Sequence, residues 1–113
     1  MLWLPLDNGT TIGQIGSESG IIIRDEEHED GARITLERDG QIAPFARTCG
    51  IYGWMFHTRF FGKEAEAQDE FKRMRSELTK ILDLIPLVSD PEADQKRDVV
   101  IESISQFTER FPT

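Results

Sequence analysis

The stretch that decides the fold is residues 62–85, GKEAEAQDEFKRMRSELTKILDLI, where the hydrophobic pattern of the chain changes its period. Apolar side chains recur there every three or four residues, at Ala67, Phe71, Met74, Leu78, Ile81 and Ile85. This spacing places them on one face of an α-helix. Glu64 and Glu66 suit the positive end of the helix dipole, and Pro86 ends the pattern. We therefore predict a helix over about residues 63–85.

A second helix is predicted over about residues 90–111. Its start signal is Ser89-Asp90-Pro91-Glu92, where either Ser89 caps with Glu92 closing a capping box, or Asp90 caps with Pro91 as the first helical residue. Its apolar side is formed by Val100, Ile104, Phe107 and Phe111. Because the connection between the two helices is short, we expect them to be antiparallel.

The residues before Gly62 differ from the helical region in glycine content and in the period of their apolar residues. Residues 1–61 contain eight of the nine glycines, and their apolar residues tend to alternate, which indicates antiparallel strands. Asp39-Gly40 is typical of a two-residue hairpin turn, which would pair Leu36 with Ala43.

Two further turns complete the predicted sheet. A hairpin around residues 29–31 would join strand 21–23 to the first pair and place Glu26 opposite Arg33. A last strand, residues 54–61, follows the turn Tyr52-Gly53. The first sixteen residues, with Leu2, Leu4, Leu6, Ile12 and Ile15, could add a short hairpin.

The predicted architecture is one α+β domain spanning residues 1–113. An antiparallel sheet of about four strands, or six with the N-terminal hairpin, occupies residues 1–61, and the antiparallel helices that follow cover one face. A chain of 113 residues is the usual size of a single domain and can bury a core without crosslinks.

Charge and composition narrow the functional classes. The net charge is −8, which disfavours nucleic acid and anionic membranes as partners. Lys72, Arg73 and Arg75 form a small basic cluster, but acidic residues flank it, so a solvated helix face is expected. Cys49 is the only cysteine and the N-terminus does not look like a signal peptide, so we predict a cytoplasmic protein.

The acidic run Asp25–Asp30 is the first candidate for a metal site. A calcium loop that starts at Asp25 needs glycine at its sixth position and glutamate at its twelfth, where this chain has Asp30 and Leu36. We therefore expect a solvated hairpin end, or else a docking patch for a basic protein partner. The glycines of residues 9–20 do not match a nucleotide-binding motif, so no cofactor is predicted either.

The candidate pair for catalysis is Cys49 as the nucleophile and His57 as its base. With Tyr52-Gly53 as a two-residue turn, Cys49 faces Phe56 and His57 points to the other side of the sheet. This register separates the pair, and we therefore expect a protein that is not an enzyme.

A polar cluster is predicted at one margin of the sheet. The expected register brings Asp25, Glu27 and Arg47 together on the face that carries Ile34. Three charged groups there could form an ion-pair cluster. They could alternatively form the mouth of a pocket between sheet and helices, near Asp25, Arg47 and His57, which would favour a small-ligand-binding or enzymatic domain.

The aromatic residues of the last strand suggest self-association. Met55, His57 and Phe61 alternate with Phe56 and Phe60, and we place the first three on the face that the helices leave open. Apolar surface of this kind on a small domain usually marks a contact, most often in a two-fold homodimer. We therefore predict a non-enzymatic protein-interaction or regulatory module that self-associates.

Overall fold

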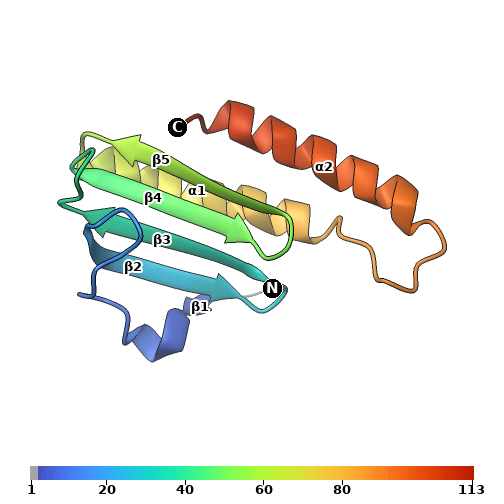
Figure 1. The fold of residues 1–113 in the computed structure, drawn as a ribbon, viewed down its shortest axis with the longest axis horizontal. Helices are drawn as coiled ribbons and strands as arrows, with labels where there is room; N and C mark the ends of the chain where they lie inside the picture. The colour runs from blue at the N-terminus through green and yellow to red at the C-terminus, as the bar shows by residue number, and fades with distance from the viewer. Residues whose placement is uncertain (1–2) are drawn as a thin grey trace.

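Each strand of the sheet pairs with the strand that precedes it in the sequence, in the order β1-β2-β3-β4-β5 (Figure 1). The computed structural model describes residues 3–113. Its elements are β1 (Trp3–Pro5), a short 3-10 turn (Leu6–Gly9), β2 (Ile21–His28), β3 (Ala32–Arg38), β4 (Phe45–Ile51), β5 (Met55–Phe61), α1 (Glu64–Leu82) and α2 (Ala93–Arg110). The predicted α+β class, a sheet followed by two helices, is confirmed, with five strands.

Helix α1 presents the predicted apolar side to the sheet, over β3 and β4. Its buried side chains are Ala67, Phe71, Met74, Leu78, Ile81 and Leu82. The helix ends at Leu82, before Ile85, because the backbone N–H groups of Leu84 and Ile85 bond in a tighter turn to Ile81 and Leu82.

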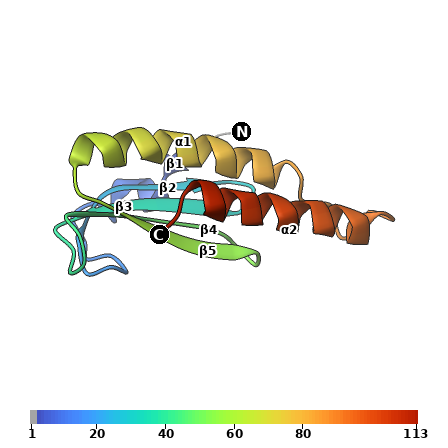
Figure 2. The ribbon, with the colours of Figure 1, turned by 90° about the horizontal axis from the view of Figure 1, so that it is seen from above.

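Helix α2 runs antiparallel to α1 and lies alongside β5 (Figures 1 and 2). It begins at Ala93, and the Asp90 carboxylate accepts the backbone N–H of Glu92 at 2.8 Å just before it. The C-terminal half of α2, which buries Phe107, lies along the sheet edge, whereas the N-terminal half projects beyond the strands.

The two faces of the sheet therefore differ, and Figure 2 shows the sheet edge-on, with α1 along one face. On the face under α1, called the covered face below, strands β3 and β4 contribute fully buried apolar residues such as Ile34, Leu36 and Ile51. No α-helix of residues 3–113 lies over the other side, called the open face.

The register of β3 and β4 corrects the predicted turn at Asp39-Gly40. Leu36 pairs with Arg47, four residues beyond Ala43, and the strands are joined by a longer loop that a hydrogen bond from Asp39 N to Pro44 O closes at 2.8 Å. Because side chains alternate with a period of two, a shift of four residues keeps every side chain on its predicted face.

The pairing of β2 with β3 differs from the prediction by one residue, and this difference changes the face on which the residues of β2 lie. Glu26 pairs with Ile34 and not with Arg33, because the turn uses three residues and not the predicted four; a bulge around Ile23 changes the register again farther from the turn. Three residues, 29–31, form the turn, and Gly31 has a φ of 105°, which favours glycine. The shift of one residue moves Asp25 and Glu27 to the open face.

The pairing of β4 with β5 also differs from the prediction by one residue. Their turn has three residues, 52–54, with Gly53 at a φ of 83°, and Ile51 pairs with Met55. Cys49 therefore lies opposite His57 on the covered face, and the prediction that the sheet separates them is wrong.

The N-terminal residues do not form the predicted hairpin with each other. Trp3 of β1 pairs with His28, and Ile15 makes an isolated bridge to Ile21, so both parts of the segment pair with β2. Leu2, which we included in that hairpin, lies outside the described residues.

Candidate functional site

A row of four polar residues crosses the open face of the sheet. Asp25, Thr35, Thr48 and Thr58 lie opposite one another on β2, β3, β4 and β5. The Thr35 hydroxyl donates to Asp25 Oδ1 at 2.9 Å, and the hydroxyl oxygens of Thr48 and Thr58 lie 3.2 Å apart. The centre of this face is thus organised by hydrogen bonds.

The carboxylate of Asp25 is buried and paired. Arg33 donates to it through Nε at 3.0 Å and Nη2 at 2.7 Å, the two-point geometry that binds a carboxylate most strongly. The hydrogen bond with Asp25 raises the pKa of Arg33. Because the two charges neutralise each other, the open face exposes little net charge at this point.

A second buried carboxylate, that of Glu37, holds the N-terminal segment against the open face. It accepts the backbone N–H groups of Gly20 at 2.9 Å and Glu18 at 3.2 Å. Gly16 lies so close that a Cβ there would be 2.4 Å from Glu37 Cδ. Two of the glycines of residues 9–20 thus allow close packing over this carboxylate.

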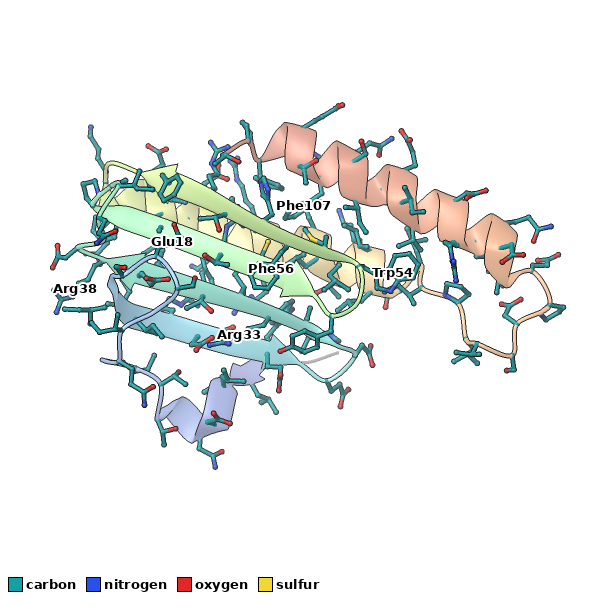
Figure 3. The ribbon with its side chains drawn as sticks, in the orientation of Figure 1. Glu18, Arg33, Arg38, Trp54, Phe56 and Phe107 are labelled. Atoms are coloured by element: carbon teal, nitrogen blue, oxygen red, sulfur yellow. The ribbon has the colours of Figure 1, made fainter. Side chains whose placement is uncertain are left out.

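A groove of about 490 Å³ lies on the open face between this segment and the β4–β5 turn. Its lining includes Thr35, Thr48 and Gly50 of the central strands, with Ile15, Tyr52 and Phe56 around them. Phe56 is 82% exposed, although its ring edge lies against Gly50 on the next strand. Figure 3 shows Phe56 and Arg33 over the central strands.

Tyr52 closes the groove at the turn. Its hydroxyl donates to Glu27 Oε2 at 2.7 Å. Burial, and then the hydrogen bond to Glu27, raise the pKa of Tyr52 to about 12, so this hydroxyl keeps its proton at neutral pH.

Cys49 and His57, the pair considered for catalysis, lie on the covered face. Cys49 is buried, its Sγ is 2.9 Å from Arg47 Nη1, and burial raises the pKa of its thiol. His57 contacts the backbone oxygen of Phe111. Although the sheet register brings Cys49 and His57 together, a buried thiol of raised pKa is a poor nucleophile.

The structure separates the predicted polar cluster. Asp25 and Glu27 lie on the open face, whereas Arg47 is buried on the covered face, so these three residues cannot line one pocket. The predicted interaction surface is corrected as well. Phe61 is 3% exposed within the core, and Met55 packs against that core, which leaves Phe56 as the exposed aromatic residue of β5.

Sequence reasoning missed Thr35, Thr48 and Arg33 as members of the site. They alternate with core residues on β3 and β4, but only the correct register aligns them with Asp25. Within residues 3–113, no group of three or more His, Cys, Asp or Glu side chains is placed to hold a metal ion.

Comparison with known proteins adds no relative. No protein-family model matches the chain, and neither a curated protein nor a solved structure shows significant similarity to it. Across the described residues, we find no helix with the length and apolar character that crossing a bilayer requires.

Proposed function

We propose that the chain is a non-enzymatic interaction module that self-associates through the open face of its sheet. The observation that carries this proposal is Phe56, a large aromatic side chain that is 82% exposed and stands beside a groove of about 490 Å³. Ile15, on the lining of the same groove, is also exposed. Clustered apolar surface of this kind usually marks a contact site.

Two copies of the chain related by a two-fold axis can bury this surface against each other. In such an interface each surface meets its own copy, so the Phe56 ring of one protomer can enter the groove of its partner, and the reverse. The groove is suited to this because Asp25 and Arg33 are already paired, so that burying them leaves no isolated charge. Aromatic anchors in pockets are the residues that usually dominate binding energy.

Sedimentation equilibrium at micromolar concentrations tests the proposal. We expect a dimer for the natural chain and a monomer for Phe56→Ser, with the circular dichroism of the two chains unchanged. Leu87→Ser is the matched control, because Leu87 is an exposed apolar residue of the connection between the helices, outside the groove. A monomeric natural chain, or equal dissociation by Leu87→Ser, would contradict the proposal.

A second candidate function is the binding of a small uncharged ligand in the same groove. It is favoured by the hydroxyl group of Thr48, which lines the groove and shares one hydrogen bond with Thr58, so that one of the two hydroxyl protons stays free to donate. A monomer that is stabilised by an amphipathic aromatic compound, and loses this effect in Thr48→Val, would support the second candidate. A basic protein partner and a cytoplasmic location stay predictions.

A further inference from the structure

Two arginines face each other on the covered face of the sheet. Arg47 of β4 and Arg59 of β5 are directly opposite in the strand register, and Arg47 is 0% exposed. Like charges in such a pair destabilise a sheet. Burying a guanidinium without a counter-ion is strongly unfavourable. The position therefore calls for a compensating negative group.

The hydrogen bonds of Arg47 do not supply that group. Its Nη1 atom lies 2.9 Å from Cys49 Sγ and 3.3 Å from the backbone oxygen of His57. Its Nε and Nη2 atoms are buried and have no hydrogen-bond partner in the structure. A buried donor that is left unsatisfied usually indicates a water or an ion at that point.

The end of the chain satisfies the neighbouring donors only in part. Arg59 Nη1 donates to Pro112 O at 3.0 Å, while Arg59 Nε is buried without a partner. His57 Nε2 contacts Phe111 O, and since a carbonyl can only accept, this nitrogen carries the proton. Both carbonyl oxygens are neutral, so they leave the charge of the arginines uncompensated.

One carboxylate faces this cluster from α1. Glu70 interacts favourably with Arg47, although burial dominates and lowers the pKa of the guanidinium. Glu70 Oε2 is itself buried without a hydrogen-bond partner. Two guanidinium groups and one carboxylate leave a net positive charge in this layer.

A cavity beside α1 shares two of its lining residues with the surroundings of the cluster. The cavity has a volume of about 420 Å³ and is lined by Glu70, Arg73, Ser76, Glu77, Arg110 and Phe111. Glu70 and Phe111 belong to both the cavity wall and the surroundings of the cluster. A small solute in this cavity is therefore separated from Arg47 and Arg59 by these two residues.

We propose that Arg47, Arg59 and His57, called the buried basic cluster, bind a small oxyanion of the phosphate or carboxylate class. Its oxygens accept hydrogen bonds from Arg47 Nε and Nη2 and from Arg59 Nε, and its charge balances the arginine pair. This site uses the covered face, so it is independent of the groove and of the proposed self-association.

The side-chain Nε–H signals of arginine in ¹⁵N-labelled protein test the proposal. We would titrate the chain with inorganic phosphate, and separately with acetate, at constant ionic strength, and follow the thermal midpoint in parallel. We expect a saturable shift of the Arg47 signal and a rise of the midpoint with at least one of the two. Loss of a charge-assisted hydrogen bond in Arg47→Met should weaken binding about tenfold or more.

Two further variants keep the test decisive. Arg38→Gln is the control, since Arg38 is exposed and paired with Asp39 away from the cluster, and it should bind the anion as the natural chain does. If Arg47→Met does not fold, Arg59→Gln should weaken binding in the same direction. An Arg47 signal that does not shift, or equal anion effects in the natural chain and the cluster variants, would overturn the proposal.

Discussion

The covered and open faces of the sheet are made by alternate residues of the same strands, yet one face is an apolar core and the other is a surface joined by hydrogen bonds. On the covered face, Ile34 and Leu36 pack against Phe71 of α1 in a core that excludes water. On the open face, Asp25 and Thr35 are joined by hydrogen bonds, and Phe56 stays exposed. From this comparison we expect the covered face to supply most of the stability, while the open face is the surface that we propose for self-association.

The two faces should differ most in the free energy of unfolding that is lost when an aromatic ring is removed from each. Phe71→Ala removes a fully buried ring and its stacking with the Arg24 guanidinium, whose Cζ is 4.0 Å from the ring centroid. We expect a loss of about 3–5 kcal/mol in the free energy of unfolding, measured by urea denaturation.

Phe56→Ala is the matched change on the open face. Since Phe56 is mostly exposed, its loss should change the free energy of unfolding of the monomer by about 0.5 kcal/mol or less. Similar losses for the two variants, measured below the concentration at which the chain associates, would contradict the contrast between the faces.

Removal of the buried carboxylate should show how far the open face also contributes to stability. Asp25→Ala leaves Arg33 and the Thr35 hydroxyl without their acceptor, which should cost about 2 kcal/mol. A double-mutant cycle with Arg33→Ala isolates the ion pair, and we expect a coupling of about 1 kcal/mol because Arg33 is partly exposed. A coupling near zero would show that the pair does not stabilise this face.

Close packing of the N-terminal segment should give a somewhat smaller effect. In Gly16→Ala the added methyl would lie 2.4 Å from Glu37 Cδ, so either the segment or the carboxylate must move, at a cost of about 1 kcal/mol. Gly62→Ala is the control, because nothing lies within 4 Å of a Cβ there. Thermal unfolding of both variants checks the prediction, which fails if their midpoints fall equally.

The weakest effect concerns Tyr52 and appears only at alkaline pH. Its pKa is about 12 in the folded chain against an ordinary value of 10.0. Because the folded value is higher, the contribution of the Tyr52 hydroxyl to stability is complete below about pH 10 and is lost as the pH rises towards 12. The chain has one tyrosine, so ultraviolet titration reports it alone.

Glu27→Gln sharpens this measurement. It removes the carboxylate that accepts the hydrogen bond from the Tyr52 hydroxyl, so the pKa of Tyr52 should fall part of the way towards its ordinary value, while burial still raises it. An unchanged titration curve in this variant would show that Glu27 does not hold the hydroxyl.

The helices could be predicted because their signal is local. The buried side of α1 matches the spacing from Ala67 to Ile81, and the prediction differs from the structure mainly at the ends. The faces of β3 and β4 were also predicted correctly, although the turn at Gly40 was not, because the error was an even number of residues.

The site could not be predicted in the same way. Three-residue turns at residues 29–31 and 52–54 each shift the pairing by one residue from the predicted register. The first shift moves Asp25 from the side of Ile34 to the side of Thr35, and the second brings His57 opposite Cys49. Nothing in a single strand reveals the number of residues that its turn will use.

By itself, then, the sequence determined the class of the fold, the two helices and the apolar side that each must bury, because these depend on the spacing of residues along one element. The tertiary structure decided which polar side chains meet. The pairing of Arg47 with Arg59, the row from Asp25 to Thr58 and the exposure of Phe56 depend on strand register and on which face α1 covers. The strand register and the face that α1 covers are set by contacts between residues far apart in the chain. A shift of one residue in the register exchanges the two faces of a strand.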